Sequence, residues 1–143
     1  MTTPESIVTS LDWSRKLKGA GFNPWPLHEW FVGPVGPPLV IESQYNGDTR
    51  SYPAPTAEEI LRRLPPFIID GKRNGDTVTY DLHVQAVSGM EAMSGAKWKL
   101  WYFRVRDGIE LAPLGNYSYA DSLANAAAAM YCYLAEQKLL PSE

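Results

Sequence analysis

Proline placement limits where this chain can form helices more strictly than any other feature of its sequence. Seven of the twelve prolines lie between residues 22 and 55, at positions 24, 26, 34, 37, 38, 53 and 55. Proline lacks the backbone N–H that a helix interior requires and its ring clashes with the preceding turn, so this segment excludes a helix. It instead favours strands at residues 27–32 and 39–45, separated by a Gly/Pro turn. The Asn-Gly-Asp sequence at 46–48 predicts a hairpin with a short return strand at 50–52.

Three helices are predicted outside the proline-rich segment. The first begins at Thr9, which is expected to act as its N-cap. The second begins with Thr56 and Glu59, whose spacing is that of a capping box. The third spans residues 120–138 and carries small side chains at 126–129, which allow a helix to lie close against a sheet.

Strict alternation of apolar and polar residues over 77–87 predicts a strand with one buried face and one solvent-exposed face. Residues 97–106 are predicted to form the next strand. Together these patterns predict an α+β fold with a single domain over residues 1–143, an antiparallel sheet of about five to six strands, and three helices mainly on one sheet face. Residues 1–8 are expected to form an arm or a short strand, and residues 141–143 a tail.

Composition narrows the class of protein. Thirteen basic and sixteen acidic side chains give a net charge of −3, whereas nucleic-acid binders usually carry a basic excess. Cys132 is the single cysteine, so no disulfide forms within the chain. The longest apolar stretch, residues 126–135, is shorter than the ~20 residues that span a bilayer. With no signal-peptide pattern at the start, the chain is expected to be soluble and cytoplasmic, with no membrane partner.

Few residues of this chain point to catalysis. The two histidines, His28 and His83, have no metal-ligand spacing, and no serine has the context of a nucleophile. The sequence therefore assigns no catalytic residue, no metal and no cofactor. The weakest alternative is an enzyme acting on a nucleotide or a sugar, with His83 and either Asp81 or Glu42 as its acid and base.

A basic strand face is a candidate nucleic-acid site. The alternation of apolar and polar side chains expected of a strand fails along residues 97–106, and a β-bulge near Tyr102 and Phe103 would restore it. Such a bulge would turn five side chains outward together: Lys97, Lys99, Trp101, Arg104 and Arg106. Lysines and arginines around an aromatic ring can bind single-stranded nucleic acid by phosphate neutralisation and base stacking. The alternative is an ordinary solvated face, on which aliphatic stems cover the indole.

An aromatic segment is the candidate site for a protein partner. Residues 22–31 hold four aromatic side chains in a stretch with little regular structure. Exposed tryptophans often anchor protein interfaces, so the expected partner-binding residues are Trp25, His28, Trp30 and Phe31. The alternative is that these rings cover the edge of the sheet as a small secondary core.

Ordered motifs give the chain a family resemblance. They are T-S-L-D-W-S at 9–14, Trp30 in a strand, A-P-T-A-E-E-I-L-x-x-L-P at 54–65, and A-x-x-L-A-x-A-x-x-x-M at 120–130. In this order they resemble a widespread group of small accessory proteins of bacteriophages and prophages. The resemblance implies a protein made in the bacterial cytoplasm, and it carries over no catalytic residue.

The resemblance favours a non-enzymatic accessory protein that binds a host or phage protein or sequesters a small ligand, with a role in countering host defence. The loops at residues 33–38 and 88–95 lie outside the shared motifs, so a function specific to this chain is expected there. A single-stranded nucleic acid is the alternative partner. A homodimer through the small side chains at 124–128 stays open, because the same face can equally well pack on a sheet.

Overall fold

The α+β class predicted from the sequence is confirmed. The computed structural model describes residues 7–22, 26–42, 51–73, 76–87, 89, 95–106, 109–113 and 118–140. In these ranges it contains three helices and eight strands, and the strand pairs are antiparallel. The strands form two sheets, one of three strands in the order β2-β1-β3 and one of five strands, in which β4-β5-β6-β7 are neighbours and β8 pairs with β6.

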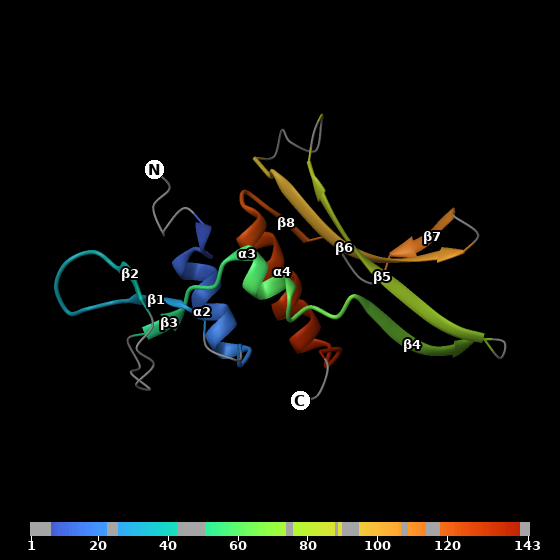
Figure 1. Cartoon of the computed structure of the whole chain (residues 1–143), viewed down its shortest axis with the longest axis horizontal. Helices are drawn as coiled ribbons and strands as arrows, with labels where there is room; N and C mark the ends of the chain where they lie inside the picture. Colours follow the sequence, from blue (N-terminus) through green and yellow to red (C-terminus); the bar gives the residue numbers. More distant parts are fainter. Residues whose placement is uncertain are drawn as a thin grey trace.

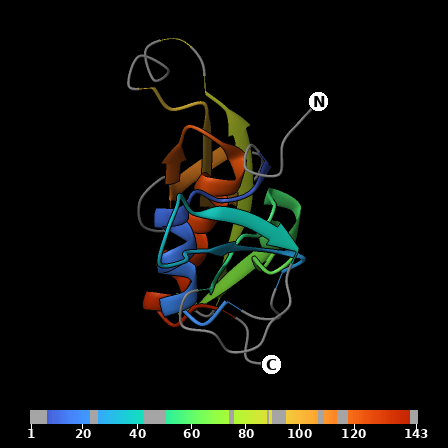
Figure 2. The same cartoon turned by 90° about the vertical axis from the view of Figure 1, so that its left-hand side faces the viewer.

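The helices lie between the two sheets (Figure 1). Helix α2 (Leu11–Gly19) packs beside β3 (Ser51–Pro53) of the small sheet and beside α4 (Leu123–Glu136). Helix α4 lies in turn against β6 (Trp98–Arg106) and β8 (Ser118–Ala120) of the large sheet. Figure 2, viewed from the side of the small sheet, shows these layers one behind another.

The helices cover one face of the large sheet, as the sequence predicts. That sheet also contains β4 (Phe67–Arg73), β5 (Asp76–Ala86) and β7 (Ile109–Pro113). Leu100 and Tyr102 of β6 are fully buried in the core that the sheet shares with α4. The Tyr102 hydroxyl donates a 2.7 Å hydrogen bond to the carbonyl of Pro65, and burial raises the pKa of this phenol.

Small side chains let α4 approach the sheet closely. Ala126, Ala127 and Ala128 are fully buried, and the Ser118 hydroxyl of β8 donates a 2.7 Å hydrogen bond to the Ala126 carbonyl. The alanine face that the sequence left open between a sheet and a second copy therefore packs within its own chain.

The start of α2 differs by one residue from the prediction. Ser10, not Thr9, is the N-cap, and its hydroxyl accepts a hydrogen bond from the Trp13 N–H. Thr9 is fully buried instead, with its hydroxyl 2.7 Å from that of Ser14. Its neighbour Val8 is also buried, in a bridge to Thr56, so the predicted arm is ordered at this end. Residues 1–6 and 141–143 lie outside the described residues.

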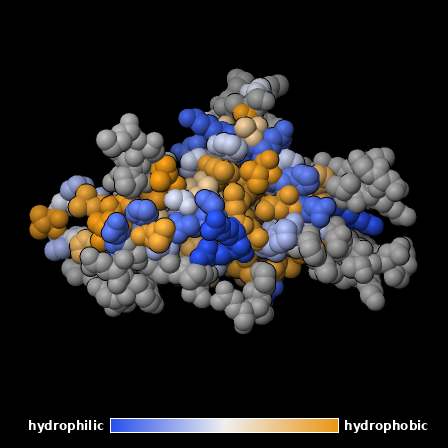
Figure 3. All heavy atoms as spheres, in the orientation of Figure 1, coloured by the Kyte–Doolittle hydropathy of each residue, from blue (hydrophilic) through white to orange (hydrophobic). Residues whose placement is uncertain are grey.

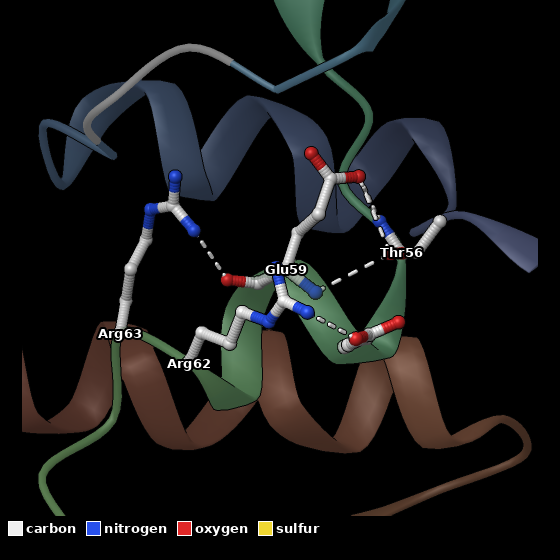
Figure 4. Close-up of polar contacts among 5 residues, drawn as sticks. Thr56, Glu59, Arg62 and Arg63 are labelled. Atoms are coloured by element: carbon white, nitrogen blue, oxygen red, sulfur yellow. Dashed lines mark hydrogen bonds and ion pairs between the residues drawn. The ribbon is translucent and has the colours of Figure 1, made fainter.

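Helix α3 (Ala57–Leu61) begins with the predicted capping box (Figure 4). One Glu59 carboxylate oxygen accepts hydrogen bonds from the Thr56 N–H and hydroxyl, while the Glu59 N–H donates to that hydroxyl. The other oxygen accepts a 3.1 Å hydrogen bond from the Leu27 N–H. A local capping interaction thus also ties α3 to the small sheet.

Two predicted strand details are wrong. First, β3 pairs with β1 (His28–Phe31), not with β2 (Leu39–Glu42), so the predicted hairpin at 39–52 does not form as a strand pair. Its Asn-Gly-Asp sequence lies outside the described residues. Long-range pairing with β1 has replaced the local pairing that the turn motif favours.

Second, β6 contains no bulge near Tyr102 and Phe103. Its pairing with β5 is continuous from Trp98 to Phe103, and Tyr102 points into the core. The register shift lies beyond Arg104, and the extra residue is Leu111 of β7, because Arg104 pairs with Ala112 and Val105 with Glu110. Side chains of β6 therefore alternate without interruption.

Candidate functional site

The β1–β2 arm, defined as residues 26–42, carries the most exposed large apolar side chains of the described structure. Val35 is 90% exposed, Leu27 is 74% exposed and Leu39 is 54% exposed. The arm forms the end of the molecule remote from the large sheet (Figure 1). Figure 3 shows apolar atoms at this protruding end. Exposed apolar side chains that gather at one place commonly mark a binding surface.

The tip of the arm is a turn built from glycine and proline. Pro34, Pro37 and Pro38 are exposed and flank Val35. Gly36 has a φ of +88°, which a side chain would strain. The fixed φ of each proline limits the conformations of the turn, so Val35 is presented at little cost in conformational entropy.

The charge of the arm is negative. No lysine or arginine occurs between residues 19 and 49 of the sequence. Within the arm, Glu42 is exposed at the end of β2, whereas Glu29 is buried. Within the arm, the polyanionic backbone of a nucleic acid would meet no lysine or arginine, so this surface suits a protein better. Basic groups of α2, Arg15 and Lys18, lie over Tyr52 of the adjacent strand β3.

The four residues predicted to bind a partner have different environments. Trp25 lies outside the described residues. The Trp30 indole is half-buried and donates a 2.9 Å hydrogen bond to the Thr9 carbonyl. Phe31 is half-buried, and a Cβ at Gly33 would lie 3.3 Å from its ring. His28 is half-buried, and its Nδ1 has no hydrogen-bond partner among the residues that the structure describes.

These contacts favour the alternative of a small secondary core for Trp30. Through this hydrogen bond the indole holds Thr9, in the segment before α2, against β1. Thr9 is held a second time by its own N–H, which donates a 3.1 Å hydrogen bond to the Pro55 carbonyl. The sequence points to the loop at residues 33–38, which contains Val35, but it does not identify Val35 or Leu39 as binding residues, because the prediction rests on aromatic side chains. The available signal is an isolated valine in a Gly/Pro turn.

The predicted basic face of β6 is divided between two sides of the sheet. Lys99 and Trp101 alternate with Leu100 and Tyr102, which face the helices. They therefore lie on the other side of the sheet, together with their pairing partners Gln85 and His83. Arg104 follows Leu100 and Tyr102 on the helix side, since alternation is uninterrupted. Lys97 precedes the strand and is exposed, and the Arg106 side chain is outside the described part. Continuous alternation thus separates the arginine from the lysine and the tryptophan.

An aromatic cluster occupies the sheet face away from the helices. The His83 ring lies 3.8 Å from the Phe103 ring and 5.6 Å from the Trp101 ring, centroid to centroid. The Lys99 ammonium lies 4.9 Å from the Trp101 ring centroid. Trp101 and Phe103 are buried and outside the core cluster, so they present little ring surface for base stacking.

The described ranges contain no cluster of three or more His, Cys, Asp or Glu side chains suited to a metal ion. Asp81 and His83 share a sheet face, as the enzyme alternative requires, but the His83 ring packs on Phe103. None of the helices described has the length and apolar character that crossing a membrane requires.

Cys132 is expected to react slowly with thiol reagents. Burial disfavours the charged thiolate and raises the pKa of Cys132 to about 11. The positive charge of Lys16 acts in the opposite direction. Near neutral pH the thiolate population is therefore about 100-fold below that of a thiol with a pKa of 9.0. We expect Ellman's reagent to react at least about tenfold faster after unfolding in guanidinium.

The folded protein should gain reactivity as the pH rises toward the pKa of Cys132, while its far-UV circular dichroism stays constant. Equal reaction rates for the folded and unfolded chain near neutral pH would contradict the buried environment of this thiol.

Comparison with family models, with curated proteins and with solved structures finds no match to this chain.

Proposed function

We propose that this chain is a non-enzymatic accessory protein of bacteriophage type that binds a host or phage protein in the bacterial cytoplasm. The observation that carries the proposal is the β1–β2 arm, whose apolar side chains Leu27, Val35 and Leu39 are exposed at one end of the molecule. An interference with host defence, as the resemblance to phage proteins suggests, is compatible with a surface that only binds.

The shape of the arm favours a protein over a small ligand. Sites for small molecules are concave and enclose most of the ligand. The arm instead projects, with Val35 at its tip between exposed prolines. A projecting apolar tip fits into a pocket of a larger partner. The exposed Glu42 lies opposite His28 at the other end of β2, so a basic side chain of the partner is expected at the base of the arm and not around that pocket.

The proposal predicts that acidic substitutions in the arm abolish partner capture. Wild-type protein and the double variant Val35→Asp/Leu39→Asp would be immobilised and exposed to lysates of infected and uninfected host cells. Both side chains are exposed, so the fold should persist, while two carboxylates in an apolar interface should reduce partner recovery about 30-fold or more. Quantitative mass spectrometry of the captured proteins measures this ratio.

Ile7→Asp is the matched control, because Ile7 is a large apolar side chain that is exposed outside the arm. This variant should capture the same protein as the wild type. A partner recovered equally by the double variant and the wild type would contradict a binding site on the arm.

A further inference from the structure

The large sheet has an open edge along the second half of β5. Strand β4 pairs with β5 only from Asp76 to Asp81. Strand β6 pairs with the other side of β5 as far as Ala86. No described strand therefore lies on the outer side of residues 83–87, and Figure 1 shows β4 alongside only the first half of β5.

Two backbone hydrogen bonds fix which groups face this edge. The Leu82 N–H donates to the Pro66 carbonyl at 3.1 Å, on the β4 side. The Val87 N–H donates to the Lys97 carbonyl at 2.8 Å, on the β6 side. Since backbone groups alternate in direction along a strand, Val84 and Ala86 direct their N–H and C=O groups outward.

This edge lacks the features that usually prevent strands from pairing between molecules. Residues 82–87 contain no charged residue and no proline. Val84 is 41% exposed and Ala86 is exposed. By contrast, β2 at the edge of the small sheet is preceded by Pro37 and Pro38 and ends at the exposed Glu42. Charged residues and prolines of this kind block edge-to-edge association.

We propose that a second copy of this chain pairs antiparallel with the open edge of β5. An interface around a twofold axis requires a surface that is complementary to itself. With the axis at Gln85, Val84 lies opposite Ala86 of the partner subunit, and Ala86 opposite Val84 of the partner subunit. Both residues of each pair direct backbone groups to the interface, so each pair exchanges two hydrogen bonds.

The neutral composition of the edge favours a second copy in particular. In this register no like charges are opposed, because Asp81 lies opposite position 89, which is a glycine. The dimer does not depend on the arm or its partner, and it joins the large sheets of both copies into one.

Ala86→Pro tests this dimer by removing one outward N–H. Proline is tolerated at a strand edge where its missing N–H would face solvent, so the monomer should keep its fold. Ala86→Ser is the matched control, since it retains the N–H. Sedimentation equilibrium over a range of concentrations should show a monomer–dimer equilibrium for the wild type and for the control, with a dissociation constant at least about tenfold higher for Ala86→Pro.

A wild-type chain that stays monomeric at the highest attainable concentration would overturn the proposal, as would a folded Ala86→Pro that dimerises like the wild type. If Ala86→Pro fails to fold, Val84→Lys provides the test. Its exposed side chain places a positive charge in each copy at the interface, so dimerisation should weaken and recover with added salt. Unchanged dimerisation of folded Val84→Lys would also overturn the proposal.

Discussion

Leu100→Ala is expected to lower the free energy of unfolding by about 2–5 kcal/mol, the range for leucine-to-alanine changes in protein cores. Leu100 is fully buried at the centre of β6, where it pairs with Val84 of β5 and Ser118 of β8. Helix α4 lies against β6, and Leu100 belongs to the same buried cluster as Ala126 and Ala127. Alanine side chains are too short to fill the cavity that the substitution leaves. Urea denaturation followed by tryptophan fluorescence measures the loss.

Leu39→Ala is the matched control because it is the same substitution at a leucine that is 54% exposed. Its effect should stay within about 0.5 kcal/mol, as for most surface substitutions. Similar losses for the two variants would contradict the placement of Leu100 in the core. A small loss for Leu39→Ala would also show that the fold tolerates a substitution at this exposed position of the arm.

Local interactions were predictable from the sequence. The capping box of Thr56 and Glu59 involves residues three positions apart, so its signal is complete within one short segment. The alternation over residues 77–87 correctly places Tyr80 and Leu82 toward the core and His83 on the other face. In both cases the interacting groups, or the period that separates them, lie within one element.

Contacts between distant elements were not predictable in the same way. The Asn-Gly-Asp turn favoured pairing of neighbouring strands, whereas β3 pairs with β1 between residues 20 to 24 positions apart in the sequence. The bulge predicted in β6 rested on the assumption that one face is buried along its whole length. The core cluster instead includes Leu100 and Tyr102 and no described residue of β6 beyond them, so Arg104 can follow on the same face.

The candidate site shows the same limit. The residues predicted to bind lie within 25–31, whereas the most exposed large apolar side chains of the described structure are Leu27, Val35 and Leu39 and not the ring of Trp30. Whether a side chain of this segment is exposed to solvent depends on its contacts with residues that are distant in the sequence. Trp30 finds the carbonyl of Thr9, twenty-one positions away, and composition alone does not reveal that contact.

Trp30→Ala is expected to destabilise the fold by about 3 kcal/mol, the lower end of the range for buried aromatic side chains, since the ring is half-buried. It would remove both the packing of the indole and its 2.9 Å hydrogen bond to the Thr9 carbonyl. Trp30→Phe keeps an aromatic ring but removes the hydrogen bond and part of the indole surface, so it should cost less than Trp30→Ala, with about 1 kcal/mol coming from the hydrogen bond. Urea denaturation of both variants measures these losses.

The same pair of variants separates a structural role of Trp30 from a binding role. If the arm binds through Val35 and Leu39, folded Trp30→Phe should capture the partner as the wild type does. Trp30→Ala should then lose capture only to the extent that it unfolds, and capture should recover at lower temperature. Loss of capture by Trp30→Phe at full stability would instead assign the indole to the interface, as the sequence alone had suggested.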